Sequence, residues 1–592
     1  MLALMSAVAL GIVFGGCSSV RARLHSTVGP DGPVTAVDLR TPTANNSPML
    51  AADGTDPRFV VAAFRRDAPD LGCGLQVSGD GGRGWVPARP VPRLPRGAEK
   101  CYAPEVAFDQ AGTLYYLFVG LQGRGNNPMG VFLTSSEDRA RTFRPPRLVL
   151  GPSNYQVRMA IDPTLGAHGR IHLVWLHVGA PAPLGGLPPA ANPILAKHSD
   201  DGGRSFSAPV PVSDGNRPRA VAPALALGPG HTVDVLYYDL QRDVRDYEGL
   251  QGPTWSYSPW SLVAATSSDG GEHFGPGATV NERLVPPGRV MLIYTMPPPA
   301  LVAGPSGALY AAWTDARNGD PDVFMARSGD GGRDWSAPLR LNDDAPHNGR
   351  DQYLPRLSLA ADGRIDAIFY DRRADRGDRY NDVSYTSSSD GGRHFTPNVK
   401  LTSEASDSQI GQRYLVPSAT GLVELGSRIG LLSRAGGALA VWTDTRNTSP
   451  GLAQQDLFSA QVPSGDSGSS PSTYPAPAPA VVNVAMRDYR FDYNPAIPAG
   501  PVVFRVSNQG RLDHELLLTV LPEGFPPIDA QLHGSIRRPL GILGQLPRRR
   551  PGISGTFAVD LAPGRYAMIS FVAGTDGVQD DLKGMSSEFR VR

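Results

Sequence analysis

Paired acidic and basic side chains recur just after short apolar segments of this chain. Two of these places share the sequence Trp-Thr-Asp-x-Arg-Asn, and two others begin with Tyr-Asp. The arginine fork binds carboxylates at two points, and an aspartate can serve as a general acid or bind a cation. We therefore predict a site for an acidic small molecule or a glycan, with candidate residues Asp239, Asp315, Arg317, Asp371, Arg372, Asp444 and Arg446.

The same spacing supports a structural alternative. An Asp two residues before an Arg, repeated at several places, is also the pattern of an ion pair that stabilises a turn. Catalytic residues are expected to break a repeat, whereas these residues follow it. Both interpretations stay open at the level of the sequence.

One aromatic segment adds to the candidate site. Residues 243–260 contain Tyr247, Trp255, Tyr257 and Trp260. Aromatic faces pack well against sugar rings, so we include Trp255 among the candidate ligand-binding residues. The alternative is a loop that only covers the site.

The elements that must position these residues are set by a repeated phrase. Ser, any residue, Asp, usually Gly-Gly, and an aromatic residue five places after the Asp occur six times. Side chains of Ser and Asp can bond backbone N–H groups in a tight turn, and glycines accept positive φ angles. A period of about 60 residues indicates a repeat architecture. The six aspartates, all predicted to be structural, are Asp80, Asp138, Asp201, Asp269, Asp330 and Asp390.

This phrase resembles the Asp box, or BNR repeat, of the sialidase-type β-propellers. The resemblance covers residues 34–462 and implies an all-β propeller whose Asp boxes lie on the face opposite the active site. Seven apolar strand copies accompany the six boxes, which favours seven blades, with the segment 34–39 completing the last blade. Six blades, with residues 410–437 as an insertion, is the alternative.

The catalytic residues of sialidases do not carry over to this sequence. Those enzymes use three arginines, a Tyr activated by a Glu, and an acidic Asp, and the first Arg belongs to a Phe/Tyr-Arg-Ile-Pro motif. Phe64-Arg65-Arg66-Asp67 is the nearest match and is poor. Tyr353 and Tyr414 open strands, but Tyr102 and Tyr155 recur in similar places, which indicates an architectural role. The catalytic residues are therefore unknown.

A second domain follows a linker rich in Pro, Ser and Gly at residues 463–480. Residues 481–592 resemble a cupredoxin. Carried over by position, His514 and Met585 match copper ligands, whereas Ser570 replaces the Cys and Asp580 stands near the second His. Because a blue-copper site needs a thiolate, the resemblance implies a fold without its metal. We predict no cofactor and no metal.

Charge, the N-terminal segment and the cysteines limit the cellular compartment and the partners that we expect. Lys plus Arg equals Asp plus Glu at 56 each, so no net field favours nucleic acid. Residues 1–17 look like a bacterial lipoprotein signal with Cys17 as the lipidated residue, followed by a tether at 18–33. The alternative is an ordinary cleaved signal or an uncleaved anchor. Cys73 and Cys101 are predicted to form a disulfide, with two buried thiols as the alternative.

Two functions from different classes remain. The first is an exported, lipid-anchored or secreted monomeric propeller that binds a glycan or another acidic ligand at the cell surface without an intact sialidase site. The second is a glycoside hydrolase of exo-sialidase type with a rearranged site. The missing Phe/Tyr-Arg-Ile-Pro motif favours the first.

Overall fold

The structure is a computed structural model in which nearly all regular elements are strands. It describes residues 31–35, 42–89, 92–124, 126–165, 168–178, 192–241, 260–284, 298–318, 320–407, 410–411, 413–414, 422–423, 425–448, 454–463, 480–521, 524–533, 542–561, 563–574 and 576–591. The described helical segments are the short α1 (Ile528–Leu532), η1 (Pro229–His231) and η2 (Asp580–Lys583).

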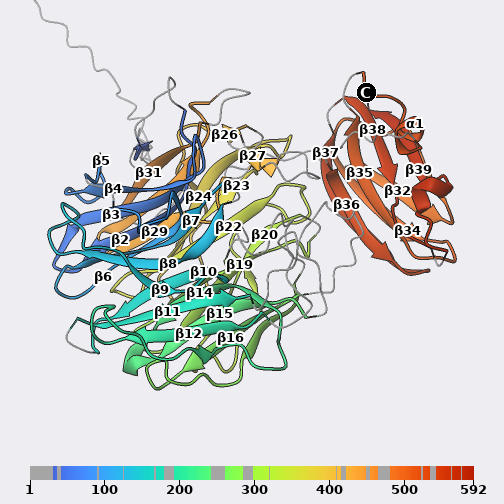
Figure 1. Ribbon diagram of the computed structural model, residues 1–592. Helices are drawn as coiled ribbons and strands as arrows, with labels where there is room; N and C mark the ends of the chain where they lie inside the picture. Colours follow the sequence, from blue (N-terminus) through green and yellow to red (C-terminus); the bar gives the residue numbers. More distant parts are fainter. Residues whose placement is uncertain are drawn as a thin grey trace, which may run out of the picture.

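Seven antiparallel sheets of the described chain form the blades of a propeller (Figure 1). Blade 1 contains β2 (Asn45–Asp53), β3 (Asp56–Arg66), β4 (Gly72–Ser78) and β5 (Val86–Pro87). Blade 2 contains β6 (Lys100–Phe108), β7 (Leu114–Gln122), β8 (Asn127–Ser136) and β9 (Arg147–Leu150). Blade 3 contains β10 (Asn154–Asp162), β11 (Arg170–His177), β12 (Ile194–Ser199) and β13 (Val210–Pro211). Blade 4 contains β14 (Ala220–Leu227), β15 (Val233–Asp239), β16 (Trp260–Ser267) and β17 (Ala278–Leu284). Blade 5 contains β18 (Ala300–Ala303), β19 (Leu309–Asp315), β20 (Asp322–Ser328) and β21 (Leu339–Arg340).

Blades 6 and 7 complete the ring. Blade 6 contains β22 (Gln352–Leu359), β23 (Ile365–Asp371), β24 (Tyr380–Ser388) and β25 (Val399–Lys400), with β26 (Ser406–Asp407) paired to β24. Blade 7 contains β29 (Gly430–Arg434), β30 (Gly437–Asp444), β31 (Asp456–Pro463) and β1 (Gly32–Pro33). A small hairpin pairs β27 (Arg413–Tyr414) with β28 (Leu422–Val423).

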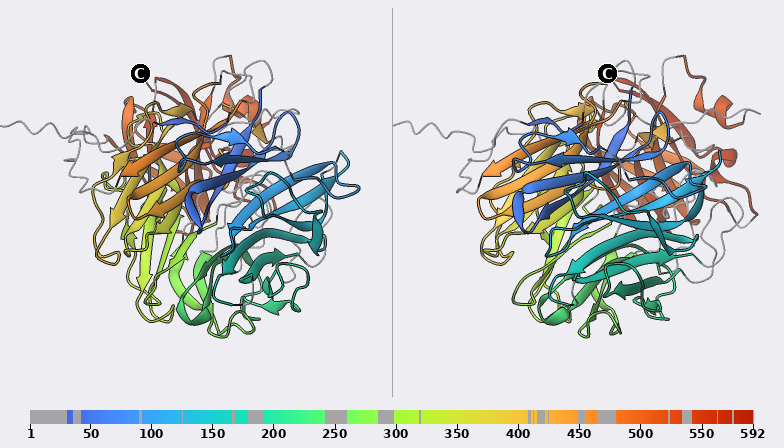
Figure 2. Two further views of the ribbon diagram at one scale, coloured as in Figure 1. Left: turned by 90° about the vertical axis from the view of Figure 1, so that its left-hand side faces the viewer. Right: turned by 60° about the vertical axis from the view of Figure 1, so that its left-hand side comes forward.

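The first strands of the blades form the inner wall of the ring. Contacts run from β2 to β6, β10, β14, β18, β22 and β29 in turn, and β29 returns to β2. Figure 2 shows the same arrangement, with the blue first blade beside the orange last blade. The prediction of an all-β propeller with seven blades is confirmed.

The ring closes by pairing the two ends of the propeller. Pro33 lies opposite Phe458, and the Val34 N–H donates to the Leu457 carbonyl at 2.7 Å. The closing strand begins two residues earlier than the predicted segment 34–39, of which residues 36–39 lie outside the described residues. This pairing gives the outer edge of β31 a partner strand.

The six Ser-x-Asp turns join the third and fourth strands of blades 1 to 6. In the fifth copy, Ser328 Oγ donates to Asp330 Oδ1 at 2.7 Å and accepts from the Gly332 N–H at 2.9 Å. The second copy forms the same turn without glycines, because Arg139 and Ala140 adopt φ angles of 60° and 63°. The turn therefore depends on the Ser and Asp side chains more than on glycine.

The C-terminal segment forms two four-stranded sheets. One has the order β33 (Arg490–Tyr493), β32 (Ala480–Arg487), β34 (Gly500–Asn508) and β37 (Ser554–Leu561). The other has the order β36 (Ile542–Arg549), β35 (His514–Leu521), β38 (Gly564–Ile569) and β39 (Ser586–Val591). Both sheets contribute to one hydrophobic core, in which Phe504 and Phe557 meet Leu518 and Met568.

Candidate functional site

The predicted Asp and Arg residues lie at the ends of second strands, on the face opposite the Ser-x-Asp turns. Asp315 ends β19 and is fully buried, and it accepts hydrogen bonds from the Arg317 N–H at 3.0 Å and from Arg317 Nε at 2.8 Å. Asp444 and Arg446 repeat this arrangement at 2.8 Å and 2.7 Å. Asp239 accepts the Gln241 N–H at 2.9 Å. These carboxylates therefore stabilise their own turns.

The arginines of these turns pack on their own blades. The guanidinium of Arg317 lies 4.8 Å from the Phe324 ring centroid, and that of Arg446 lies 4.1 Å from the centroid of Phe458. Both phenylalanines belong to third strands. In these two turns the Asp and Arg side chains therefore form the turn-stabilising ion pair of the structural alternative. The remaining candidate, Trp255, lies outside the described residues.

In blade 6 the two neighbouring arginines have different partners. Arg373 binds Asp371 through Nε at 2.6 Å, whereas Arg372 Nη1 lies 3.1 Å from both Asp351 and Asp378. The Asp351 N–H also donates to Asp378 Oδ1 at 2.9 Å. Enclosure by protein, with the neighbouring charge of Asp378 added, raises the pKa of Asp351. Asp351 and Asp378 therefore form a carboxyl pair that shares one arginine.

A repeated β-bulge shapes the inner wall of the ring. The pairing of first and second strands shifts after Tyr102, Tyr155 and Tyr353, and resumes at Glu105, Arg158 and Arg356 respectively. Each bulge contains one residue with positive φ, at Ala103 (48°), Gln156 (52°) and Leu354 (57°). A bulge re-aims the side chains around it. It places a charged residue at the same level of the inner wall in blades 2, 3 and 6.

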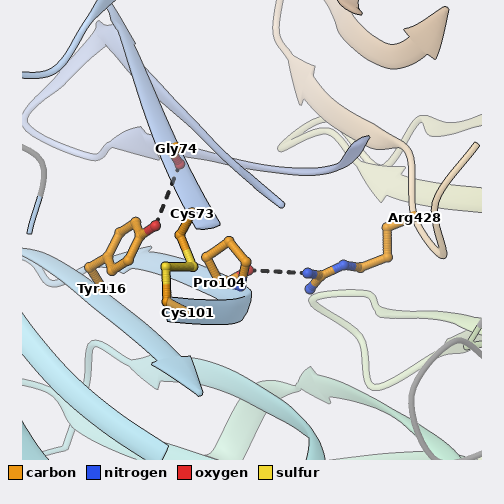
Figure 3. The surroundings of a disulfide bond; sticks show 6 residues. All are labelled: Cys73, Gly74, Cys101, Pro104, Tyr116 and Arg428. Carbon is orange, nitrogen blue, oxygen red and sulfur yellow. Dashed lines mark hydrogen bonds between the residues drawn. A yellow bond between two sulfur atoms is a disulfide. The ribbon is translucent and has the colours of Figure 1, made fainter. Parts of the chain in front are cut away.

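Glu105 connects three blades at the centre of the ring. Arg158 Nη1 from blade 3 lies 2.8 Å from Glu105 Oε1, and Arg428, just before blade 7, binds the same oxygen. Arg428 Nη2 also donates to the Pro104 carbonyl at 3.1 Å, a contact drawn in Figure 3. Blades 7 and 2 are separated by blade 1, so side chains from their inner strands meet only over the central axis.

Arg65 extends this group on the side of blade 1. Its Nη1 donates to Tyr102 Oη at 2.8 Å, and its Nη2 lies 2.7 Å from Asp67 Oδ2. The guanidinium carbon also lies 5.0 Å from the Tyr102 ring centroid. We call Arg65, Arg158, Arg356 and Arg428, together with Asp67, Tyr102 and Glu105, the axial arginine cluster.

Arg356 differs from the other arginines of the cluster. Within the described part of the chain, its guanidinium has no hydrogen bond or ion pair, although the residue is half-buried and lies near the charges of Glu105 and Arg428. Burial, opposed by Glu105 and reinforced by Arg428, lowers its pKa, and burial lowers that of Arg428 to about 10. Both side chains stay protonated at neutral pH.

The axial arginine cluster carries excess positive charge. Four arginines face two carboxylates, those of Asp67 and Glu105, so its formal charge is +4 − 2 = +2. Enclosed like charges repel one another strongly because the surroundings screen them poorly. A bound anion relieves this repulsion. The geometry therefore makes the cluster a candidate anion site, in which Arg356 is the donor without a described partner.

This cluster is not among the sites predicted from the sequence. Tyr102, Tyr155 and Tyr353 recur at similar places, and a charged residue stands three places after each of them. The repeated pattern Tyr-x-x-Glu/Arg was the available signal. Arg428 had no comparable signal, because it lies outside the pattern.

The C-terminal segment brings together three of the residues that were predicted, from the cupredoxin resemblance, to stand at copper-ligand positions. Asp580 Oδ2 lies 2.8 Å from His514 Nδ1 and accepts a hydrogen bond from Ser570 Oγ, also at 2.8 Å. His514 Nε2 lies 3.1 Å from Asp488 Oδ1. Met585 is fully buried, and its carbonyl accepts the Ser570 N–H at 3.1 Å. Both ring nitrogens of His514 are thus engaged by carboxylates.

Among the described residues, no group of three or more His, Cys, Asp or Glu side chains could hold a metal ion. Likewise, no helix there is long and apolar enough to cross a membrane.

Comparison with solved structures finds distant likenesses. A protein of unknown function from Dyadobacter fermentans is 14% identical, covering 74% of this chain and 99% of that one, with a TM-score of 0.40. The phage phi92 endosialidase is 13% identical, covering 77% and 72%, with a TM-score of 0.41. An ulvan lyase of polysaccharide lyase family PL25 is 14% identical, covering 70% and 94%, with a TM-score of 0.40. No family model and no curated protein matches the chain.

Proposed function

We propose that the propeller is an exported binding protein whose axial arginine cluster holds an acidic sugar through its carboxylate. The observation that carries this proposal is the Arg356 guanidinium, which is enclosed in a cluster of charge +2 and has no protein partner among the described residues. A guanidinium presents a planar fork of donors that matches a carboxylate. The ligand carboxylate takes the place of the missing partner.

The other groups of the cluster suit a hydroxylated ligand. Glu105 accepts hydrogen bonds only, and Tyr102 can both donate and accept. Both lie among the arginines, Glu105 on Arg158 and Tyr102 on Arg65. A sugar acid offers hydroxyl groups to these side chains and a carboxylate to Arg356, whereas chloride or sulfate offers no hydroxyl donors.

Export rests on two features of the chain. The segment 1–17 reads as a lipoprotein signal ending at Cys17, which would anchor the propeller to a membrane through lipid. The Cys73–Cys101 disulfide fits an oxidising compartment outside the cytoplasm. The proposed setting is the bacterial cell surface.

Calorimetric titration tests the proposed function. The chain from residue 18 onward is titrated with D-glucuronate, with N-acetylneuraminate and, as the neutral control, with D-glucose. We expect binding of at least one acid and none of glucose, with affinity falling as salt rises because the interaction is ionic. Equal affinity for glucose and glucuronate would contradict a site built on arginine.

A second candidate function, glycoside hydrolysis, is favoured by the carboxyl pair of blade 6. A general acid must hold its proton, and burial beside Asp378 raises the pKa of Asp351 in that direction. Fluorogenic sialosides and glucuronides test this candidate directly. Turnover that disappears in Asp351→Asn would establish hydrolysis, and no turnover by the native chain would leave binding as the function.

A further inference from the structure

The Cys73–Cys101 disulfide lies directly beside the axial arginine cluster. Cys73 belongs to β4 in blade 1, and Cys101 belongs to β6, the innermost strand of blade 2. Both cysteines are buried, with 8% and 7% of their surface exposed. The bond therefore ties the inner strand of one blade to the preceding blade (Figure 3).

The four residues after Cys101 make all the contacts described above between blade 2 and the arginines of the cluster. Tyr102 accepts from Arg65, the Pro104 carbonyl accepts from Arg428, and Glu105 binds Arg158 and Arg428. A shift of this segment would displace all of them together. The position of Cys101 thus bears on three arginines at once.

The sheet holds this segment only at its ends. Tyr102 pairs with Val119 and Glu105 with Leu117, but the bulge between them leaves Ala103 and Pro104 out of the register. Ala103 has a φ of 48°, a conformation that costs free energy for a residue with a Cβ atom. Pro104 has no N–H to donate. A strained bulge persists when its surroundings fix it, and the disulfide is the covalent restraint next to it.

We infer that the Cys73–Cys101 disulfide is a positioning device for the ligand site, so that the propeller binds its acidic ligand in the oxidised form and loses affinity when the bond is reduced. This inference rests on the proposed function. Reduction by dithiothreitol gives each sulfur one electron and one proton, and the two thiols of the reagent close into its own cyclic disulfide. Cys101 keeps its pairing with Gly120 but is no longer tied to blade 1, so the bulge at 103–104 loses the covalent restraint next to it.

The test compares the oxidised chain with the Cys73→Ser/Cys101→Ser variant and with the native chain after reduction, confirmed by thiol titration. D-glucuronate is the probe, and hydrogen exchange is measured in parallel. We expect binding to be at least tenfold weaker in the Cys73→Ser/Cys101→Ser variant and in the reduced native chain than in the oxidised chain. Amide exchange at Tyr102, Ala103 and Glu105 should become faster, while exchange at the equivalent bulge of blade 3 (residues 155–158) stays unchanged.

Tyr116→Phe is the matched control. Tyr116 is buried in the same contact between blades 1 and 2, where its hydroxyl donates to the Gly74 carbonyl at 3.4 Å (Figure 3), but it makes no part of the segment 101–105. This variant loosens the contact without releasing Cys101, so its affinity should match that of the native chain.

Three outcomes decide the inference. Equal affinity and equal exchange in oxidised and reduced chains would overturn it and leave the disulfide as a staple of the fold. Equal weakening in Tyr116→Phe would also overturn it. If the oxidised chain binds no acid at all, the proposed function fails, and exchange alone then decides: faster exchange confined to 102–105 supports the positioning role, and unchanged exchange refutes it.

Discussion

Arg428 and Pro104 join two blades that are not neighbours in the ring. The guanidinium Nη2 of Arg428 donates to the Pro104 carbonyl at 3.1 Å, and the two residues are 324 positions apart in the sequence. This contact crosses over blade 1 and fixes one wall of the axial arginine cluster. The cluster is therefore part of the closure of the ring as well as the proposed ligand site.

Replacing Arg356 separates binding from stability. We expect Arg356→Ala to weaken acid binding by about 10- to 100-fold, since a hydrogen bond to a charged group contributes about 1.5–3 kcal/mol. The melting temperature should stay the same or rise, because the variant removes a charge that repels Arg428. Titration and thermal melting measure the two effects. Arg333→Ala, at an exposed arginine in a Ser-x-Asp turn, is the control and should change neither.

The two serines of the sixth turn should differ sharply. Ser388 is buried and accepts the Gly392 N–H at 2.9 Å, whereas Ser389 is exposed. Ser388→Ala leaves a buried donor without a partner, at a cost of about 1–3 kcal/mol. Thermal melting should show a clear decrease for Ser388→Ala and almost none for Ser389→Ala. Equal melting temperatures would refute the structural role of these turns.

The ion pairs of blades 5 and 7 provide a graded test. Arg446 binds both Asp444 and Asp31 at 2.7 Å and is 9% exposed, while Arg317 is 30% exposed. Breaking a buried pair costs about 3–5 kcal/mol, so Arg446→Ala should lower the melting temperature more than Arg317→Ala. Because Asp31 precedes the closing strand β1, hydrogen exchange at Val34 should also increase in Arg446→Ala. Loss of ligand with unchanged melting would instead place the binding site at these turns.

The C-terminal domain should lose stability as pH rises above neutrality. Burial alone lowers the pKa of His514, but its bonds to Asp580 and Asp488 outweigh this and raise the pKa above the ordinary value. The charged imidazole therefore stabilises the fold fully below its unfolded pKa of about 6.5, and this contribution disappears as pH rises through the higher folded pKa. Hydrogen exchange of β35 and β38 from pH 6 to 9 measures it. His514→Gln should remove the trend, and a trend of opposite sign would exclude a buried imidazolium.

Copper should not form a blue site in this domain. Ser570 supplies no thiolate, and Asp580 and Asp488 occupy both nitrogens of His514. Adding Cu(II) to the full chain should give no intense visible band of the thiolate-to-copper kind. Such a band would refute the alignment of Ser570 with the missing cysteine.

The sequence alone determined the architecture, because the signals that specify it are local. Each Ser-x-Asp turn closes through bonds within five residues, as from Ser388 to Gly392. Blades 1 to 6 are built from strands that follow one another in the chain, and only blade 7 takes a strand, β1, from the other end of the propeller. Seven apolar strand copies therefore sufficed to count the blades. The ion pairs of Asp315 and Asp444 could also be predicted from the sequence, because their arginine partners lie only two residues away.

Only the tertiary structure decided the candidate site. Glu105 and Arg428 are 323 positions apart, and they meet because the ring closes and because bulges aim inner-wall side chains at the axis. The same closure leaves Arg356 among like charges without a partner in the described chain. Such an excess of charge belongs to an arrangement in space. The spacing of residues along the chain does not reveal this excess, since Glu105 and Arg356 alone read as ordinary strand residues and Arg428 lies outside any repeated pattern.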